Sequence, residues 1–264
     1  MPRELYLHRS ESLVVISSLS ACGKTEKPPV SNGIDTTDTQ DMSIPSIPQC
    51  TYEYTIQEHS TIVSETESGG RNTKFLRFPV LRNMANAEIQ TKVNAILLVA
   101  AENFYTTTLR DIDIYMEEGT IFNYEVTSCT VEYASDNFLS VRSAINFTTS
   151  TSEYSTNSVY TTNIDLRTGE ELTGEDLFSD FTTINNMFIG GDFTREYGLE
   201  NILSLTNYSD MILQYKIDRN IYPDVYFNYD KLIINIDLTD SLGSSAGFSI
   251  PLADVRECLK VIPN

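Results

Sequence analysis

Few side chains in this sequence are suited to nucleophilic or acid–base chemistry. There are only two histidines, His8 and His59, and no tryptophan. Residues 243–247 (GSSAG) match the G-x-S-x-G pattern around the nucleophilic serine of α/β-hydrolases. That serine needs a histidine base later in the chain, and no histidine follows His59. We therefore interpret Ser245 as a non-catalytic loop residue, in a loop where Gly247 allows a tight backbone path.

Adjacent carboxylates are the next candidates, because paired acids carry out the chemistry of glycosidases. Three such pairs occur in the chain: Glu117-Glu118, Glu170-Glu171 and Glu175-Asp176. Adjacent residues on a strand or helix usually point apart, and each pair lies near an expected turn or helix start. We interpret these pairs as solvated charges. The sequence predicts no catalytic residue, and we expect that the chain is not an enzyme.

No metal or cofactor site is expected either. Zinc prefers histidine and cysteine ligands at close spacing, and the four cysteines lie far apart: Cys22, Cys50, Cys129 and Cys258. If Cys22 carries a modification, three cysteines remain. One disulfide, from Cys50 or Cys129 to Cys258, could form in an exported protein and would leave one thiol over.

The net charge of the chain indicates which kinds of partner it can bind. The chain of 264 residues holds 18 Lys and Arg against 37 Asp and Glu, which gives a net charge of −19. An acidic surface of this size repels a phosphate backbone, so we expect no nucleic-acid partner. The same charge favours encounter with a cationic partner.

The N-terminus resembles a bacterial lipoprotein signal. Residues 13–21 (LVVISSLSA) form a short apolar run that ends in small residues directly before Cys22. In signals of this kind a peptidase cuts before the cysteine, and the thiol then receives a diacylglycerol. The run is shorter than the roughly 20 apolar residues that a spanning helix needs. The alternative interpretation is a buried N-terminal strand with an incidental cysteine.

The segment that follows supports the signal. Residues 23–49 are rich in Pro, Ser, Thr and Asp, and such a stretch cannot bury enough surface to offset its ordering entropy. We therefore expect three parts in chain order: a signal peptide over 1–21, a flexible tether over 22–49 and a folded domain over 50–264. The domain could consist of two packed halves, about 50–150 and 151–264. The expected location is extracytoplasmic, with a lipid anchor in the cell membrane.

A helical pattern follows Asn86. Its apolar residues recur along one helix face: Ile89, Val93, Ile96, Leu97, Ala100 and Phe104. This spacing predicts a helix over 86–104. Alternating polar and apolar residues predict strands before it, over 51–58 and 73–81. We expect Pro79 at a sheet edge or strand end, because proline cannot donate to a strand ladder.

The next predicted strands span 121–133, 138–149 and 160–166. In the first of them the inward-facing phase slips near residues 127–128, which indicates a β-bulge. Gly169 suits the turn after the third strand, because glycine adopts a positive φ at little cost. Thr173 and Asp176 have the spacing of a capping box at the start of a short helix.

The remaining elements complete the predicted fold. Residues 181–219 are expected to be mainly helical, with breaks around residues 190–191 and 207, and a hairpin follows over 225–238. A strand over 248–250 and a last helix from Pro251 end the chain. Elements in this order predict an α+β fold, a mostly antiparallel sheet with helices packed on it.

Three stretches resemble the extracytoplasmic sensor region of the lysozyme-binding anti-sigma factor RsiV and the non-catalytic N-terminal domain of some peptidoglycan deacetylases. They are residues 75–94 (a strand, a proline and an Asn-bearing helix), 162–178 (a D-L-x-T-G turn and a D-L-F helix) and 225–254 (a hairpin and an I-P-L ending). The resemblance would cover residues 51–264 and implies an α+β domain. The family often has a Gly-Gly-Ala-His loop where this chain has residues 149–158 (TSTSEYSTNS), so ligand contacts of that loop cannot be carried over.

The anchor, the tether, the resemblance and the missing acid–base residues together predict a surface-anchored, non-catalytic binding lipoprotein. The resemblance implies lysozyme or a cell-wall glycan as the first ligands to test. Loops 149–158 and 239–246 are the candidate binding loops, with Tyr154 and Asp240 as candidate contact residues. Two alternatives stay open: a cell-wall hydrolase that works through carboxylates, and a purely structural envelope lipoprotein.

Overall fold

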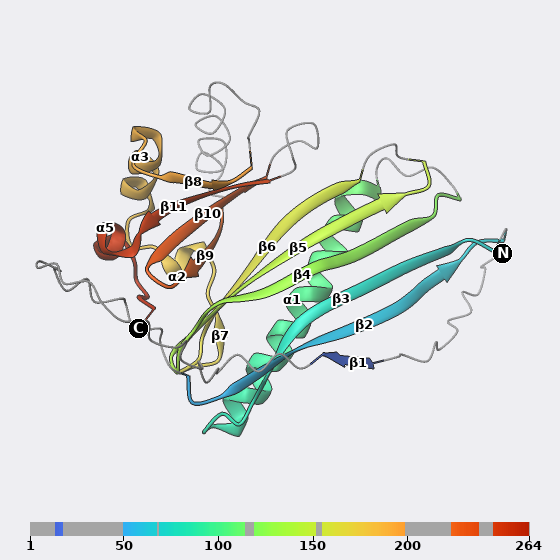
Figure 1. Ribbon diagram of the computed structural model, residues 1–264, viewed down its shortest axis with the longest axis horizontal. Coiled ribbons are helices and arrows are strands. Elements are labelled where there is room, and N and C mark those ends of the chain that lie inside the picture. The colour runs from blue at the N-terminus through green and yellow to red at the C-terminus, as the bar shows by residue number, and fades with distance from the viewer. Residues whose placement is uncertain are drawn as a thin grey trace, which may run out of the picture.

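The computed structural model of this chain describes residues 14–17, 50–67, 69–113, 119–151, 155–198, 223–237 and 245–263. Two β-sheets and one long helix make up most of these residues (Figure 1). Strand pairing is antiparallel at all but one of the described ladders. The predicted class is therefore confirmed: an α+β fold, a mostly antiparallel sheet with helices packed on it.

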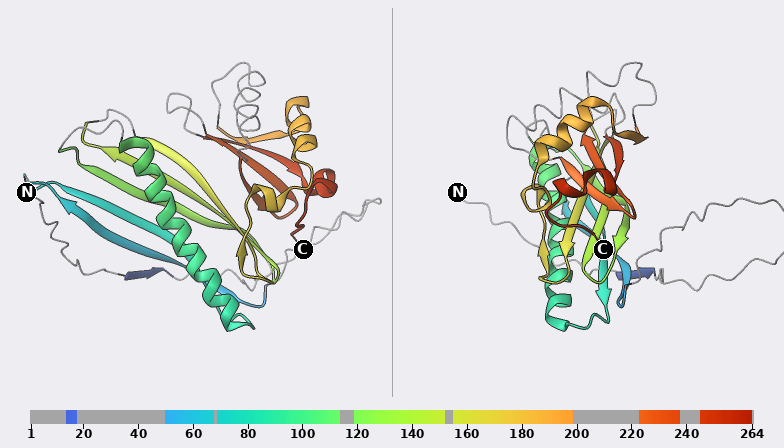
Figure 2. Two further views of the ribbon diagram at one scale, coloured as in Figure 1. Left: turned by 180° about the vertical axis from the view of Figure 1, so that it is seen from behind. Right: turned by 90° about the vertical axis from the view of Figure 1, so that its left-hand side faces the viewer.

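The first sheet has seven strands that lie in sequence order. They are β1 (Val14–Ser17), β2 (Glu53–Glu65), β3 (Arg71–Arg82), β4 (Phe122–Ala134), β5 (Phe138–Thr149), β6 (Thr156–Asp165) and β7 (Glu170–Glu171). Helix α1 (Ala87–Asp113) connects β3 to β4 and lies across one face of the sheet, as Figure 2 shows from behind. This helical crossover returns the chain in the same direction, so β3 and β4 are parallel.

The second sheet has four strands in the order β8-β11-β10-β9. They are β8 (Thr194–Tyr197), β9 (Asp224–Asn228), β10 (Lys231–Asp237) and β11 (Ser245–Pro251). The short helices of this region are α2 (Gly174–Leu177), α3 (Phe181–Gly190), α5 (Leu252–Val255) and the 3-10 helix η2 (Arg256–Cys258). Phe188 of α3 packs edge-on against Phe248 of β11, with ring centroids 5.1 Å apart, so α3 and the second sheet share a core.

Helix α1 begins where the sequence predicts and ends later. The Asn86 side chain accepts hydrogen bonds from two backbone N–H groups of the first turn, which caps the helix. The expected end near residue 104 is nine residues too early, because the helix continues to Asp113. The added turns carry Tyr105, whose ring packs edge-on against the buried Tyr124 of β4 at 5.1 Å. This tertiary contact stabilises the additional turns, which the apolar pattern of the helix alone does not indicate.

The seam between β3 and β4 is short. The two strands pair only where Thr73–Phe75 lies beside Asn123–Glu125. Further along β3, the Asn94 side chain of α1 bonds both backbone groups of Leu81: Leu81 N–H donates to Oδ1 at 2.7 Å, and Nδ2 donates to the Leu81 carbonyl at 2.9 Å. Pro79 was expected at a sheet edge or strand end; it lies inside β3, at a point where β3 pairs with β2 only and is locally an edge. The strand tolerates the proline there because β4 no longer pairs with it.

Several local predictions are confirmed. Strand β5 has the predicted bounds, and the register of β4 against β5 shifts between Val126 and Ser128, at the predicted bulge. Gly169 has a φ of +67° in the turn after β6. Thr173 and Asp176 form both hydrogen bonds of a capping box at the start of α2.

The predictions for the C-terminal third hold only in part. Residues 181–219 were expected to be mainly helical, with breaks around residues 190–191 and 207. Helix α3 and its end at Gly190 agree with this expectation, but strand β8 follows where helix was expected, and residues 199–222 lie outside the described residues. Gly247 lies inside β11 and not in a loop. The Tyr197 ring packs directly on it, so that a Cβ at Gly247 would stand 2.2 Å from ring atom Cε1. A close side-chain contact, and not a turn, requires this glycine.

Strand β1 falls within the predicted signal peptide. It pairs with β2 in an antiparallel register that runs from Val14 opposite His59 to Ser17 opposite Ile56. The chain thus has a strand where the alternative interpretation of residues 13–21 placed one. Removal of residues 1–21 before Cys22 stays a prediction. Within the described residues, no helix combines the length and the apolar character that a membrane span requires.

The disulfide that the sequence left possible is not formed. Cys258 is joined to neither Cys50 nor Cys129. The reason is their placement in different cores: Cys258 packs against the core of the second sheet, whereas Cys50 and Cys129 pack against the core beneath α1.

The sheet face opposite α1 divides into two halves. Over the covered half, formed by β4 to β6, the second sheet packs: buried Ser140 accepts a hydrogen bond from the Phe227 N–H of β9 at 3.0 Å. Asn163 donates to the Val225 carbonyl at 2.8 Å. The open half is formed by β2, β3, the start of β4 and the end of β5 that pairs with it, and its Ser60 and Asn123 are exposed.

Candidate binding face

The open half presents a group of side chains that we call the open face. Its members are Glu58, Phe75, Arg77, Asn123, Glu125 and Asn146. They share a side of the sheet because residues directly opposite each other in paired strands point the same way. Glu58 lies opposite Arg77, and Phe75 lies opposite Glu125. Glu125 in turn lies opposite Asn146 of β5, so the open face spans four strands.

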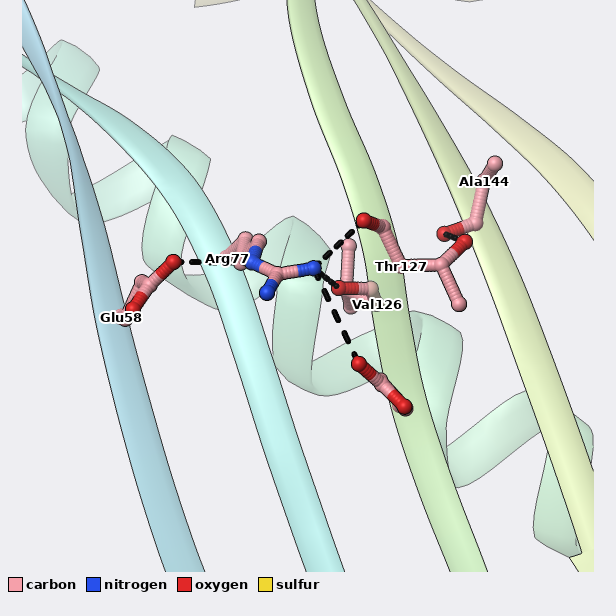
Figure 3. Close-up of polar contacts among 6 residues, drawn as sticks. Glu58, Arg77, Val126, Thr127 and Ala144 are labelled. Atoms are coloured by element: carbon pink, nitrogen blue, oxygen red, sulfur yellow. Dashed lines mark hydrogen bonds and ion pairs between the residues drawn. The ribbon is translucent and has the colours of Figure 1, made fainter.

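Arg77 is the centre of the open face (Figure 3). Its Nε donates to Glu58 Oε1 of β2 at 3.0 Å, and its Nη1 donates to the Val126 carbonyl of β4 at 2.9 Å. Nη1 also donates to the Thr127 carbonyl and lies 3.8 Å from Glu125 Oε1. One guanidinium therefore connects strands β2, β3 and β4.

The limited pairing between β3 and β4 explains why Arg77 makes these contacts. Beyond the last β3–β4 pair, the carbonyls of Val126 and Thr127 have no strand partner in β3, and they sit where β4 bulges. A planar guanidinium with several fixed donors suits such a pair of carbonyls. Its Cζ lies 4.7 Å from the Phe75 ring centroid, a cation–π contact that holds the group in place. The side chains of Arg77 and Glu58 are each 24 % exposed, so a ligand can reach them.

Neutral polar groups flank this centre. Thr73 donates to the Asn123 side-chain oxygen, and Asn146 Nδ2 donates to Asn157 Oδ1 at 2.8 Å. Both contacts lie at exposed positions. Each amide keeps further donor or acceptor capacity for a ligand, because an amide offers two donors and one two-lone-pair acceptor.

The arrangement offers fixed polar groups to a ligand. Both carboxylates of the open face lie beside Arg77, and the face holds no nucleophile beside a base. In the part of the chain that the structure describes, no group of three or more His, Cys, Asp or Glu is placed to hold a metal ion. Fixed donors, acceptors and one aromatic ring can recognise a polar ligand.

Cys129 lies close to this site but is no reactive thiol. Burial raises the pKa of its thiol to about 11, against smaller opposing effects of a hydrogen bond with Ser143 and the charge of Arg77. The thiolate is the nucleophilic form of cysteine, so this side chain is inert near neutral pH.

A second arginine marks the covered half. Arg142 of β5 lies under the second sheet, with its Cζ 5.0 Å from the Tyr197 ring centroid and 5.9 Å from that of Tyr226. Its Nη1 lies 4.0 Å from Glu132 Oε1. Burial raises the pKa of both tyrosines, so they stay neutral. The Tyr197 hydroxyl donates to Asn235 Oδ1 at 2.8 Å, which ties this cluster to β10.

The predicted site residues do not take part in what is described above. Cys22, Tyr154 and Asp240 all lie outside the described residues. The same holds for Glu117-Glu118, whereas Glu170 and Glu171 form the edge strand β7. Asp176 has a structural role: hydrogen bonds from Thr173 hold the pKa of its carboxyl below the usual value and cap α2. Ser245 starts strand β11.

Sequence reasoning missed the open face, although a signal was present. In the run Lys74–Val80, Leu76 and Phe78 point to the α1 side, and Arg77 lies between them. A charged residue between two buried ones marks the outer side of a half-buried strand. This pattern shows on which side of the strand Arg77 lies. It does not show the hydrogen-bond partners of Arg77, because they belong to a segment about 50 residues further along the chain.

Comparison with known proteins adds a likeness of fold. No protein-family model matches the chain, and no curated protein matches it. Among solved structures, a DUF3298 family member from Bacteroides fragilis is similar at 12 % identity and a TM-score of 0.47, over 81 % of this chain and 96 % of that chain. A DUF3298 family protein from Pseudomonas aeruginosa is similar at 12 % identity and a TM-score of 0.45, over 82 % of this chain and 98 % of that chain. The chain is thus structurally similar to DUF3298 family proteins at distant sequence identity, and the likeness says nothing about activity.

Proposed function

We propose that this chain is an extracytoplasmic binding lipoprotein that holds a polar partner on the open face without transforming it. The observation that carries the proposal is the division of one sheet face into a covered and an open half. On the open half, Glu58, Arg77 and Glu125 are fixed by one another while they stay in reach of solvent. Binding residues held on a rigid sheet lose little entropy when a ligand docks.

Charge selects a class of partner. The open face carries two acids and one arginine, and the whole chain carries a net charge of −19. Long-range attraction speeds association with a cationic protein, and hydrogen bonds at the face then fix the orientation. The resemblance of residues 51–264 to the RsiV sensor region supports lysozyme as the first protein to test, and a cell-wall glycan as the second ligand.

Calorimetric titration tests the binding proposal. Lysozyme and a soluble cell-wall glycan fragment are each titrated into the full chain and into the double variant Glu58→Gln/Glu125→Gln. We expect lysozyme to bind the variant at least tenfold more weakly. The double variant Glu88→Gln/Glu175→Gln makes the same change in charge at the first turns of α1 and α2 and serves as the matched control, with less than a twofold effect.

Two outcomes would contradict the proposal. If neither lysozyme nor the glycan binds the unaltered chain, the open face has no role with these ligands. If the chain releases products from cell-wall fragments, and a carboxylate substitution abolishes the release, the protein is a hydrolase.

The location is tested separately. Cells that express the chain with and without Cys22→Ser are labelled with a clickable fatty acid and fractionated. We expect label and membrane association for the unaltered chain only. Unlabelled protein in the cytosol would remove the anchor from the proposal and leave the binding test standing.

A further inference from the structure

The outer edge of the first sheet at β2 is closed by a very short strand. β2 has 13 residues, and β1, with 4 residues, pairs only with its segment from Ile56 to His59. The opposite end of the sheet is a two-residue strand of two glutamates. A strand so short and charged is a known protection against unwanted pairing.

The β2 edge is much longer and carries acidic side chains only at Glu53, Glu58 and Glu65, of which Glu58 alone lies opposite β1. Its sequence, EYTIQEHSTIVSE, contains no proline, lysine or glycine. Its register against β3 shifts between Ile62 and Ser64, away from the segment that β1 covers. The segment from Ile56 to His59 is therefore a regular ladder, suited to pairing on both of its sides.

Strand β1 belongs to the residues that lipoprotein processing would remove. Cleavage before Cys22 detaches residues 1–21, which contain Val14–Ser17. The backbone groups of β2 that face β1 then lose their strand partner. An exposed row of N–H and C=O groups is a template for a new strand, which is the basis of recognition by β-strand addition.

We propose that the β2 edge is a docking site for one extended segment of a partner protein, and that β1 fills this site until processing removes it. The proposal rests on the proposed function, since it requires cleavage before Cys22. The chemistry of the occupant is read from β1, whose sequence VVIS holds three β-branched apolar residues in a row. The partner segment is a β-branched strand of this kind, antiparallel to β2.

The docking site is continuous with the open face. Glu58, which pairs with Val15 of β1, is also the residue that bonds Arg77 at 3.0 Å. A partner strand in the place of β1 lies next to this ion pair. One partner can therefore contact the β2 edge through its backbone and the open face through its side chains.

Peptide binding to the full chain tests the proposal. All proteins carry Cys22→Ala, which blocks lipidation, and one also carries Ile16→Pro, which breaks β1 because proline cannot donate to a ladder. The probe is a fluorescein-labelled peptide of residues 12–19, followed by anisotropy. We expect the Ile16→Pro chain to bind the peptide at least tenfold more tightly. We also expect those amides within residues 56–59 that face β1, and not those that face β3, to exchange hydrogen at least tenfold faster without peptide.

Two controls sharpen the result. A Ser20→Pro chain, changed beyond β1, is expected to behave like the Cys22→Ala parent, and a peptide with proline in place of the isoleucine is expected not to bind. Equal peptide binding with and without Ile16→Pro overturns the proposal. Dimerisation of the Ile16→Pro chain without peptide binding also overturns it, in favour of a second copy as the occupant.

The failure of this proposal differs from failure of the proposed function. Mass spectrometry of native protein that retains residues 1–21 removes the processing step and the anchor. If the labelled peptide does not bind the Ile16→Pro chain, only the proposal of a docking site at the β2 edge is refuted.

Discussion

The two halves of the sheet face opposite α1 use polar groups in different ways. On the covered half, neutral side chains make buried hydrogen bonds: Ser140 Oγ donates to Asn163 Oδ1 at 2.7 Å, and Asn163 donates to the Val225 carbonyl. On the open half, charged side chains around Arg77 make contacts that stay in reach of solvent.

This difference follows from the cost of burying charge. A neutral hydrogen bond loses little when water is removed, whereas a buried ion pair must recover a large desolvation penalty. Under the second sheet, Arg142 is the exception, and two tyrosine rings surround its guanidinium. We therefore expect the covered half to determine stability and the open half to determine recognition.

The largest expected effect is on the aromatic contact of the covered half. Phe227 is fully buried and packs edge-on against Phe138 at 5.1 Å. Phe227→Ala should lower the free energy of unfolding by about 3–5 kcal/mol, because it leaves a cavity between the two sheets. Phe75→Ala, on the open half, should cost about 1 kcal/mol, since that ring is only half-buried. Urea unfolding measures both free energies, and equal costs would contradict the claim that the covered half determines stability.

The second-largest loss of stability is expected when the buried amide of Asn163 is removed. Asn163→Ala leaves the Val225 carbonyl and the Ser140 hydroxyl without their partner, which should cost about 2–3 kcal/mol in the same measurement. Asn157→Ala is the matched control. It removes an exposed amide contact from the same strand and should change stability by less than about 0.5 kcal/mol. A control as costly as Asn163→Ala would contradict the assignment of stability to the covered half.

The third prediction concerns how stability depends on pH at Asp165, the last residue of β6. Hydrogen bonds from Arg167 hold the pKa of the Asp165 carboxyl below its usual value. Because the folded pKa is the lower one, its stabilising effect is complete above the unfolded value, near pH 4, and is lost as pH falls through the folded pKa. Asp165→Asn should flatten the acid limb of a stability–pH curve below about pH 4 and cost about 1 kcal/mol at pH 7. Arg167→Gln should flatten the same limb, and an unchanged limb in both would refute this role.

The smallest effect on stability is expected at the centre of the open face. Arg77→Gln removes a partly exposed ion pair and a donor to two carbonyls, at a cost of about 1 kcal/mol or less. Thermal unfolding at two salt concentrations measures it, and the difference should shrink at high salt because the pair is screened. A cost above that of Asn163→Ala would reverse the roles of the two halves.

Local elements of the fold could be read from the sequence. The bulge in β4, the Gly169 turn, the capping box at Thr173 and the bounds of β5 all depend on residues close together in the chain. Periodicity and turn chemistry carry such information directly.

Contacts between distant segments could not be predicted. β8 was expected as helix, and its strand state depends on pairing with β11, about 50 residues later. Pro79 lies inside β3 because the β3–β4 seam stops at Phe75, and nothing local in the sequence indicates where that seam stops. The open face escaped prediction for the same reason, since the carbonyl partners of Arg77 are known only once β4 lies beside β3.

The brevity of the β3–β4 seam bears on the order in which the molecule assembles. β2 and β3 form a local hairpin, and β4 to β7 form a meander, so each block closes only short loops. Joining the blocks requires α1 to be in place, since a parallel pair needs a long crossover. We expect the two blocks to form early and the seam to close last, when Arg77 of β3 reaches the Val126 and Thr127 carbonyls of β4.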